Sequence, residues 1–508
     1  MTPARPLLRS RPLALAAVLL ALGGCAVGPD YVRPAIDTGA GYAVATPAPA
    51  AERDVQAAWW TSFDNAALDA LVDEALQTNP TLQAARHALR AAQEMRLAQQ
   101  AAFWPQVQAG YSPTRTKIAG NLGGNSPGVQ GDGSVISTGA NEPASEGGTA
   151  PFNSPVIYNF HTAQVSVSYA PDIFGSNRRQ VEAAQAQQGA QRFELHAART
   201  TLAANLTSAA IQDGLLREEI RATEAAIAAA DSAVELVARQ RRAGYSAAQD
   251  EAQQQATLIA LQQALPPLRL QREQNRNLMR ALLGAPQDRA LPEFQLADFH
   301  LPQDLPSSLP SRLLEQRPDV RAAEEQLKAA TAQVGVARAA RLPQFTITGN
   351  VGGAAAHLSQ MFLTGGRFFD LTGNLVAPLF DAGGAKHRER AASALMAQSE
   401  AQYRATVMTA LQGVADVLRA IDSDAAALDL AERARDTARQ SWSTSRQRLA
   451  AGYADRVSAL TAELAWHQAG QQLATVQATR LVNAVALCQA LGGGWWHEPD
   501  PLVSQATP

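Results

Sequence analysis

Cysteine and methionine are scarce in this chain, which has two cysteines and six methionines among 508 residues. Cys25 follows a short apolar segment, and Cys488 lies in an apolar stretch with helical spacing. This distribution excludes a disulfide framework and gives no support for a soft-metal site. The eight histidines are scattered and form no pair at metal-ligand spacing. We therefore predict no metal site and no cofactor, and we expect Cys488 to be a buried apolar side chain.

Motifs for catalysis are absent as well. The chain has no Gly-x-Ser-x-Gly turn and no phosphate-binding loop, since Gly492-Gly493-Gly494 ends a helical pattern instead of opening one. The paired acids at 218–219 and 324–325 lie in helical segments, where adjacent side chains point to different sides. We predict that the protein is not an enzyme.

Long apolar runs are missing beyond the N-terminus. Arg5, Arg9 and Arg11 precede an apolar segment at 13–22, which is typical of a secretory signal and too short to span a bilayer. No later run reaches about 18 apolar residues, so any insertion into a bilayer has to use β-strands. Removal of residues 1–24 takes three arginines and no acid, which changes the formal charge from −3 to −6. Nucleic acid is therefore not an expected partner.

The signal ends in a short motif with a cysteine. Leu22-Gly23-Gly24-Cys25 resembles the bacterial lipoprotein box, in which the cysteine becomes the lipid-modified first residue of the mature protein. In that resemblance Ala26, in place of an aspartate, implies sorting to the outer membrane. The alternative is an ordinary signal followed by a chance cysteine. We expect residues 1–24 to be a lipoprotein signal peptide, Cys25 to be lipidated, and residues 25–58 to form a Pro- and Ala-rich tether.

Most of the remaining chain consists of two copies of one plan. The segment from Pro80 to Pro105 recurs from Pro318 to Pro343 with the same spacing. The Gly-Tyr pairs at 244–245 and 452–453 recur at nearly the same offset. The predicted divisions are a first repeat at 59–290, a linker at 291–317, a second repeat at 318–492 and a C-terminal tail at 493–508.

Each repeat contains two segments in which apolar and polar residues alternate. We predict strands at about 105–117, 158–171, 343–356 and 367–379, with a long exposed Gly/Ser-rich loop at 118–155. Strands of about ten residues with one apolar and one polar face are typical of a transmembrane β-barrel, although a soluble four-stranded sheet is the alternative. Four strands cannot enclose an open lumen, so the chain must oligomerise. Three copies would supply twelve strands.

Long helical segments form the larger part of each repeat. We predict helices at about 175–243, 246–283, 384–451 and 454–491, and the proline-free segments near 68 residues would each extend ~100 Å. Pro266-Pro267 predicts a break or kink in the second of them. Apolar residues at alternating steps of four and three predict a coiled-coil seam along the third helix. The corresponding seam in the first repeat is interrupted by Asp213. The predicted seam residues are Val407, Leu411, Val414, Leu418, Ile421, Ala425 and Leu428.

Five short motifs occur in a specific order along the mature chain. They are Cys25 with Gly28-Pro29-Asp30-Tyr31-Val32-Arg33-Pro34, Trp59-Trp60 with Phe63, Arg317-Pro318-Asp319-Val320, Val376-Ala377-Pro378-Leu379-Phe380-Asp381, and Ala490-Leu491-Gly492-Gly493-Gly494-Trp495. Together they resemble the TolC-like outer membrane efflux proteins, in particular the lipoprotein (NodT-type) branch that serves resistance-nodulation-division pumps. The resemblance covers nearly the whole mature chain.

The resemblance implies a fold class that is mainly α with transmembrane β. Three chains would form a twelve-stranded β-barrel in the outer membrane, continued by a long periplasmic α-helical barrel with a mixed equatorial domain. The periplasmic tip would meet an adaptor (membrane fusion) protein, which joins the trimer to an inner-membrane pump. Gly244, Tyr245, Gly452 and Tyr453 match the turns at that tip. Tight helix-helix turns need glycine in any case, and both roles are compatible.

The resemblance also implies a pore gate just beyond the second tip turn, where relatives often carry an aspartate ring. In this chain the matching positions hold Ser458 and Thr461, which puts an acidic gate in doubt because hydroxyls do not bind cations as clustered carboxylates do. Val457 could instead form an apolar constriction. The nearby acids are interpreted as solvated helix faces. These acids are Asp250, Glu251, Asp455 and Glu463.

Three functions from different classes remain open. The leading prediction is the passive trimeric exit duct of a tripartite efflux system, which carries drugs or other small toxic compounds across the periplasm and outer membrane. The second is the exit duct of a protein-secretion system. The third is a non-channel lipoprotein that uses long coiled coils as a periplasmic spacer.

Overall fold

The computed structural model describes residues 26–37, 54–118, 156–302, 312 and 315–497. The predicted signal peptide, Cys25, nearly all of the predicted loop at 118–155 and the tail beyond 497 lie outside the described residues. None of the described helices combines the length and the apolar character that a membrane-crossing helix needs. The chain divides into two compact units, which we call the strand unit and the helical unit. The strand unit comprises Met1–Val32, Gln93–Ala186 and Lys328–Gln398, and the helical unit comprises Arg33–Ala92, Gln187–Leu327 and Ser399–Pro508.

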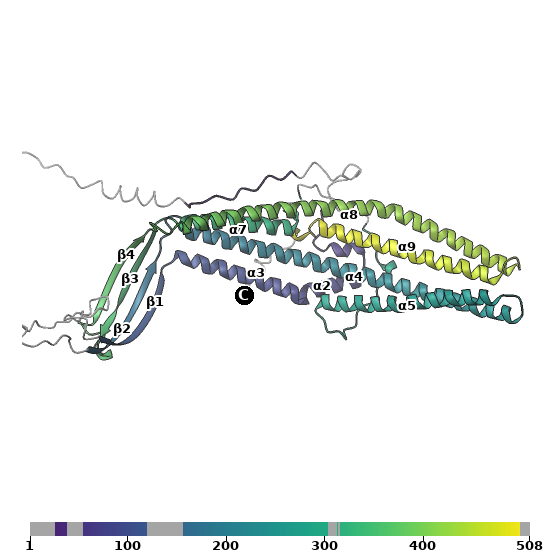
Figure 1. The fold of residues 1–508 in the computed structure, drawn as a ribbon, viewed down its shortest axis with the longest axis horizontal. Coiled ribbons are helices and arrows are strands. Elements are labelled where there is room, and N and C mark those ends of the chain that lie inside the picture. The colour runs from purple at the N-terminus through teal and green to yellow at the C-terminus, as the bar shows by residue number, and fades with distance from the viewer. Residues whose placement is uncertain (1–25, 38–53, 119–155, 303–311, 313–314, 498–508) are drawn as a thin grey trace, which may run out of the picture. The chain divides into compact units, whose positions relative to one another are not determined.

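The order of the elements repeats once along the chain. In each round a helix leads into two antiparallel strands, which are followed by a very long helix and a shorter return helix (Figure 1). The first round contains α3 (Pro80–Gln100), β1 (Gln106–Ile118), β2 (Val156–Tyr169), α4 (Ser176–Arg242) and α5 (Ala248–Leu283). The second contains α7 (Pro318–Ala339), β3 (Gln344–Ala355), β4 (Arg367–Val376), α8 (Gly384–Ala450) and α9 (Arg456–Ala490). The first round is preceded by η1 (Trp59–Phe63) and α2 (Ala66–Thr78). The predicted internal duplication is confirmed.

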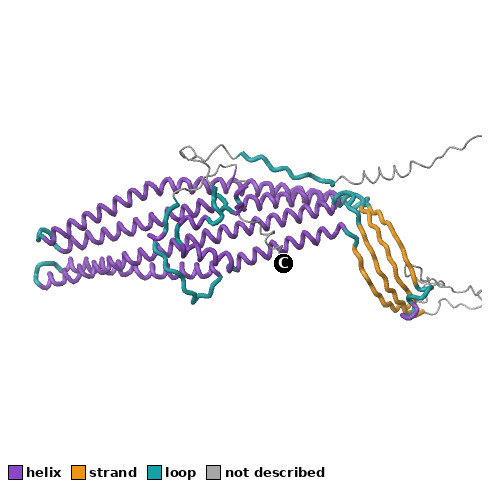
Figure 2. The backbone as a smooth tube through the Cα atoms, turned by 180° about the vertical axis from the view of Figure 1, so that it is seen from behind, coloured by secondary structure: helices purple, strands orange, loops and turns teal. Residues whose placement is uncertain are grey.

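The strand unit contains one antiparallel sheet with the strand order β1-β2-β3-β4. Figure 2 shows the four strands side by side. The register pairs Val107 with Val167, Val165 with Val351, and Val351 with Phe369. β4 ends at Val376 instead of the predicted 379, and Pro378 beyond it has no N–H to donate to a ladder.

The helical unit has its core around the short helices before α3. Trp59, Trp60 and Phe63 are buried together with the apolar face of α2. Asn65 begins α2, since its side-chain oxygen accepts from the backbone N–H of Leu68 at 3.1 Å. Asn79 begins α3 in the same way, with a 2.9 Å bond from the N–H of Leu82. These side chains satisfy amide groups that the first turn of a helix leaves unpaired.

Of the break or kink predicted at Pro266-Pro267, the break is wrong, and the kink stays a prediction. Both prolines lie inside the continuous helix α5. Both are also exposed to solvent. A proline in a helix removes its own N–H bond and leaves a carbonyl one turn earlier without a partner. On an exposed face water can satisfy those carbonyls, which explains how α5 continues through the pair.

The predicted seam on α8 is correct in its first half and shifts in its second. Val407 and Val414 are buried, as predicted, but Ala425 is exposed and Asp424 is buried in its place. The carboxylate of Asp424 accepts a 2.7 Å hydrogen bond from the side-chain amide of Asn483 on α9. A polar pair therefore replaces an apolar contact here, and the alternation of apolar residues could not reveal it.

Cys488 is 3% exposed near the end of α9, which confirms its interpretation as a buried apolar residue. Burial raises the pKa of its thiol to about 12, so the reactive thiolate is absent at neutral pH. The glycines after α9 allow close packing. A Cβ on Gly493 would lie 2.5 Å from the side chain of Thr200, and Gly494 is similarly tight against the backbone near Gln56. These glycines are predicted from the sequence to end the helix, and Gly493 and Gly494 also allow neighbouring segments to pack closely against them.

Candidate functional site

The two helical hairpins end in matching turns. At the first, Gly244 has φ 79°, and the N–H of Tyr245 donates to the carbonyl of Gln240 at 2.8 Å. At the second, Gly452 has φ 78°, and the N–H of Tyr453 donates to the carbonyl of Arg448 at 2.8 Å. This hydrogen bond and the left-handed glycine define a Schellman cap, a conformation in which a Cβ is strained. Figure 1 shows the first turn between α4 and α5 and the second between α8 and α9.

The surface of both turns is open. A Cβ placed on Gly244 or Gly452 would meet no atom within 4 Å, so only the backbone conformation requires glycine there. Tyr245 is 86% exposed and Tyr453 is 80% exposed. A tyrosine with a free ring and hydroxyl offers both apolar area and a hydrogen bond to a partner. The four residues predicted from the sequence thus form two similar exposed surfaces.

The first turns of the two return helices, α5 and α9, are capped by acids that bond in opposite directions along the chain. Before α5, Asp250 reaches back to accept from the N–H of Ala247 and the hydroxyl of Ser246, both at 3.0 Å. Before α9, Asp455 reaches forward to accept from the N–H of Ser458 at 2.7 Å and from its hydroxyl at 2.6 Å. These hydrogen bonds, that of the Ser458 hydroxyl foremost, hold the pKa of Asp455 below its ordinary value. Asp250 and Asp455 are interpreted from the sequence as parts of solvated helix faces, and the structure shows that each of the two also caps the start of a helix.

The gate candidates lie in the first turns of α9. Val457 is half-buried, while Ser458 and Thr461 are exposed. Both hydroxyls are used within the hairpin, since that of Ser458 donates to Asp455 and that of Thr461 donates to the carbonyl of Val457 at 3.0 Å. A gate requires several chains around one pore, so its lining by these residues stays a prediction.

A polar contact joins α4 to α9 in the helical unit. The side-chain amide of Gln471 donates to the hydroxyl of Thr223 at 2.9 Å, and the hydroxyl of Thr475 lies 3.4 Å from the carboxylate of Glu219. Burial raises the pKa of Glu219, and the hydrogen bond from Thr475 opposes that shift. The neighbouring Glu218 pairs instead with Arg221 at 3.3 Å. The two adjacent acids thus point to different sides, as the sequence predicts.

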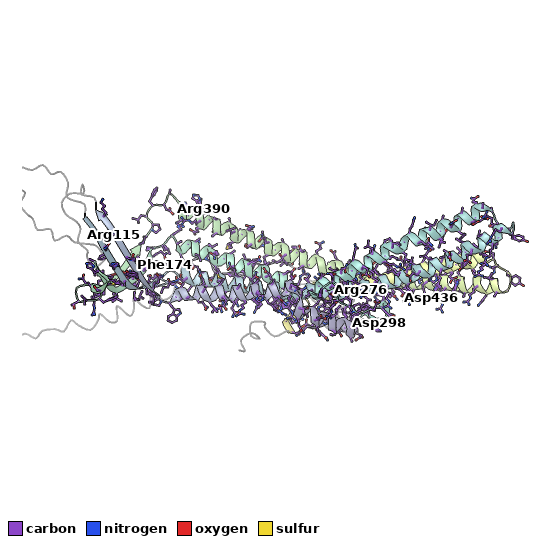
Figure 3. All side chains as sticks on the ribbon, turned by 90° about the horizontal axis from the view of Figure 1, so that it is seen from below. Arg115, Phe174, Arg276, Asp298, Arg390 and Asp436 are labelled. Carbon is purple, nitrogen blue, oxygen red and sulfur yellow. The ribbon has the colours of Figure 1, made fainter. Side chains whose placement is uncertain are left out.

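A buried ion cluster joins α4 to α5. Asp213 has no exposed side-chain surface, and its two oxygens lie 3.2 Å from Arg272 and 3.4 Å from Arg276. Figure 3 labels Arg276. Arg272 also reaches Glu293 at 2.9 Å. Burial alone would lower the pKa of Arg272, but the charges of Asp213 and Glu293 outweigh it and raise that pKa. The sequence marks Asp213 only as an interruption of a seam. The one-turn spacing of the two arginines places both on one face of α5 but does not identify Asp213 as their partner.

Aromatic stacking joins α8 to α9 nearer the second tip. The rings of Trp442 and Trp466 are parallel within 9°, with centroids 4.6 Å apart, and the guanidinium of Arg446 lies 5.7 Å from the ring of Trp442. Sequence reasoning missed this pair, because tryptophans 24 positions apart share no short motif.

An open groove of about 760 Å³ lies between α4, α8 and α9 in the helical unit. Four arginines line it, and three of them have ion-pair partners: Arg217 lies 3.0 Å from Glu293, Arg221 pairs with Glu218, and Arg435 lies 2.8 Å from Asp436. Among the residues that the structure describes, no cluster of histidine, cysteine or acidic side chains could hold a metal ion.

The sheet of the strand unit has two chemically different faces. The register brings exposed aliphatic and aromatic side chains of all four strands onto one face, which we call the apolar face. They include Val107, Tyr111, Val165, Val167, Val351, Phe369, Leu371 and Leu375. The opposite, polar face carries Gln108, Ser166, Asn350 and Asp370 in one cross-strand row, where the Asn350 amide donates to Asp370 at 2.9 Å. A sheet with polar groups on one face and exposed apolar groups on the other is suited to separate water from lipid.

The segment that carries the N-terminal motif is docked in place. In the strand unit, Asp30 pairs with Arg179 at 2.6 Å, and the N–H of Val27 donates to the carbonyl of Phe174 at 3.1 Å. In the helical unit, Arg33 pairs with the buried Glu324 at 2.9 Å. These contacts give the motif residues a structural role.

Comparison with known proteins gives consistent matches. The model of the outer membrane efflux protein family matches residues 71–285 and 309–493. The pyoverdine export outer membrane protein OpmQ of Pseudomonas putida is 29% identical over 86% of this chain and 88% of its own. The toluene efflux pump outer membrane protein TtgF of Pseudomonas putida is 26% identical over 96% of this chain and 98% of its own. The solved structure of the outer-membrane channel OprN matches with a TM-score of 0.77 and 26% identity over 93% of this chain and 100% of that chain. The chain belongs to the outer membrane efflux protein family.

Proposed function

We propose that this chain is one of three identical subunits of the outer membrane channel of a tripartite efflux system. The observation that carries the proposal is the exposed sheet with one apolar and one polar face. A soluble protein would bury such an apolar face, whereas a lipid bilayer solvates it. The fold and the family membership support the same conclusion.

The edges of the sheet support the trimer. β1 and β4 each pair with one strand within the chain, which leaves one side of each without a partner in the sheet. Unpaired strand edges are not tolerated in hydrocarbon, because their N–H and C=O groups have no water to bond. Three copies joined edge to edge would form a closed sheet of twelve strands, with the polar faces turned inward around water.

We propose that the two tip turns dock a periplasmic adaptor protein, which joins the channel to an inner-membrane pump. Gly244 and Gly452 hold matching conformations, and the exposed Tyr245 and Tyr453 supply similar contact surfaces. Three copies of two similar turns would present six quasi-equivalent sites around one ring. The chain itself would be a passive conduit without enzymatic activity, and the pump would supply the energy.

We propose that Cys25 carries the lipid anchor of the mature protein, on the basis of the motif Leu22-Gly23-Gly24-Cys25. Labelling with a radioactive fatty acid tests this proposal. Wild-type protein should incorporate the label and Cys25→Ala should not. Equal labelling of both proteins would show that the cysteine is not the attachment site.

Family membership indicates the class of the transported compounds. The names of two relatives refer to toluene efflux and pyoverdine export, both small compounds. We therefore favour small-molecule efflux over a protein-secretion duct, and a water-filled conduit over a periplasmic spacer.

Planar-bilayer recording of the purified trimer tests the channel directly. We expect discrete conductance steps, and larger steps when the tip hairpins are loosened by Trp466→Ala, which removes the stack with Trp442. The conservative variant Trp466→Phe serves as the control, because it retains an aromatic ring. Trimers that never conduct, even with Trp466→Ala, would favour the spacer.

A further inference from the structure

Charged side chains are distributed unequally between the two faces of the sheet. Arg115 and Lys117 on β1 and Arg367 on β4 all belong to the apolar face, because they alternate with polar-face residues and Arg367 pairs with Gly353 in the register. The only charged side chain on the polar face of the described strands is Asp370. A cation on a face made for lipid costs free energy unless it reaches an anion or water.

The three cations lie at the same end of the strands. Arg115 is eight positions along β1 from Val107, and Arg367 is eight positions along β4 from Leu375. At about 3.3 Å per residue and a tilt near 40°, each lies about 20 Å across the membrane from those apolar residues, and Lys117 lies about 25 Å across. The apolar band of such proteins is about 25 Å tall. The cations therefore coincide with the boundary at the strand ends opposite Gln106 and Val376; Figure 3 labels Arg115 in the sheet.

The end of the sheet that carries these cations also offers an apolar surface. In the hairpin between β3 and β4, Leu358, Phe362 and Leu363 are each at least 58% exposed. A Cβ on Gly353 would point onto the apolar face and would lie 2.9 Å from the ring of Phe362. Arg367 donates from Nε to the carbonyl of Phe362 at 2.8 Å, which fixes the hairpin and leaves its terminal nitrogens available. Neither Arg115 nor Lys117 forms an ion pair among the described residues.

We infer that Arg115, Lys117 and Arg367 bind the phosphate groups of a phosphorylated lipid in the outer leaflet, with Phe362 against its acyl chains. Within one sheet the register places Arg367 level with Tyr111, so its Cα lies about 14 Å across and about 13 Å along the strands from that of Arg115, about 19 Å in all. Two long arginine side chains can reach the two phosphates of one headgroup across that distance. In the closed trimer they become neighbours across each subunit boundary. Guanidinium groups bind phosphate by paired charge-assisted hydrogen bonds, so the site fits phosphate better than carboxylate. This inference rests on the proposed membrane location of the sheet.

Native mass spectrometry of detergent-purified full-length trimers, titrated with bis-phosphorylated lipid A, tests the site. We expect the triple variant Arg115→Gln/Lys117→Gln/Arg367→Gln to lose about 100-fold in affinity, at about fivefold for each basic residue. The matched control is Lys386→Gln/Arg388→Gln/Arg390→Gln. It also removes one lysine and two arginines, but from the start of α8, which follows the opposite end of β4, and it should bind as the wild type does. Phosphate-free lipid A should bind the wild type as weakly as it binds the triple variant.

Three results would overturn the inference: equal binding by wild type and triple variant, no preference for the phosphorylated lipid, or full competition by millimolar inorganic phosphate. If the triple variant does not trimerise, Arg115→Gln and Lys117→Gln are measured singly, and each must lose about fivefold for the site to stand. Conductance is recorded on the same samples. A conducting trimer without phosphate preference contradicts only the lipid site, whereas a wild type that never conducts contradicts the channel itself.

Discussion

At the residue scale, the tip glycines show how a backbone requirement can be separated from a packing requirement. Gly244 and Gly452 have φ near 79°, and at either position a Cβ would find no atom within 4 Å. A substitution there strains one residue and removes no contact. The strain of about 1–2 kcal/mol is small against the stability of a large assembly.

We predict that Gly244→Phe or Gly452→Phe weakens adaptor docking while the trimer stays folded. The reason is that the turn changes shape and the new ring covers the surface beside Tyr245 or Tyr453. Site-specific cross-linking to the adaptor measures the effect. Gly413→Ala is the control, since this glycine also has open space around it but lies in the helical interior of α8 and lacks a positive φ. Normal cross-linking by both Phe variants would remove the tip turns from the docking site.

Asp213 is a residue whose role depends on its partners. Because its side chain is fully buried between Arg272 and Arg276, its replacement would remove the buried carboxylate from both guanidinium groups and leave only the more exposed Glu293 near them. We predict that Asp213→Leu destabilises the folded chain by about 3 kcal/mol, although leucine restores the apolar seam. Thermal unfolding measures the loss. The triple variant Asp213→Leu/Arg272→Met/Arg276→Met should recover most of it, and a failure to recover would show that the cluster is not what the leucine disrupts.

At the element scale, the helices of the helical unit are joined by polar contacts as much as by apolar seams. α4 meets α9 through Glu219 and Thr475, and α8 meets α9 through Asp424 and Asn483. Small and polar residues let long helices pack side by side while one face stays wet. At Glu219, where burial raises the pKa, helix association is coupled to protonation.

The contact at Glu219 predicts a pH dependence. Because burial raises the pKa of Glu219 in the folded state, its charged form is penalised above that pKa and the penalty disappears as the pH falls toward the ordinary value of 4.5. We predict that Glu219→Gln raises the melting temperature at pH 7 and that the difference from wild type shrinks on acidification. Glu218→Gln is the control, since Glu218 pairs with Arg221. A difference that stays constant with pH would contradict the buried carboxylate.

The continuous helix α5 allows a prediction about its two prolines. Proline is about 3 kcal/mol less favourable than alanine in a helix interior. Because Pro266 and Pro267 are exposed and their helix continues, Pro266→Ala and Pro267→Ala should each raise the free energy of unfolding by a few kcal/mol at most. Equilibrium unfolding in urea measures this. Lower stability of either variant would mean that α5 depends on a proline-induced bend.

At the scale of the whole molecule, function depends on which face of the sheet meets lipid. Strand register determines which side chains lie on which face, because a shift of one residue along a strand moves every side chain to the opposite face. Leu371 and Thr372 are neighbours in β4 and lie on opposite faces, and both are exposed. They therefore form a matched pair for a test of orientation.

We predict that Leu371→Arg strongly reduces the amount of trimer in the outer membrane, since a charge near the middle of the lipid-facing band costs about 2–4 kcal/mol per chain. Thr372→Arg should leave trimer levels close to wild type, because its side chain enters the water-filled interior. Heat-modifiable trimer bands in outer membrane fractions measure both. The reverse result would place the polar face toward lipid.

Much of the candidate site could be predicted from the chain itself. The alternation near Val107 and Val351, the proline-free runs and the paired Gly-Tyr turns are local patterns, and each reflects the geometry of one element. The partners of Asp213 and Glu219 could not be predicted, because they are 59 and 256 positions away along the chain. Chain distance of this order carries no periodic signal.

The sequence by itself determined the repeat, the type of each element and the left-handed turns at Gly244 and Gly452, because local sterics and the spacing of apolar residues control them. Only the tertiary structure decided that α5 continues through Pro266-Pro267, that Asp424 replaces Ala425 in the seam, and that the cations of the sheet share one face. These outcomes depend on solvent exposure and strand register, which arise when distant segments pack together.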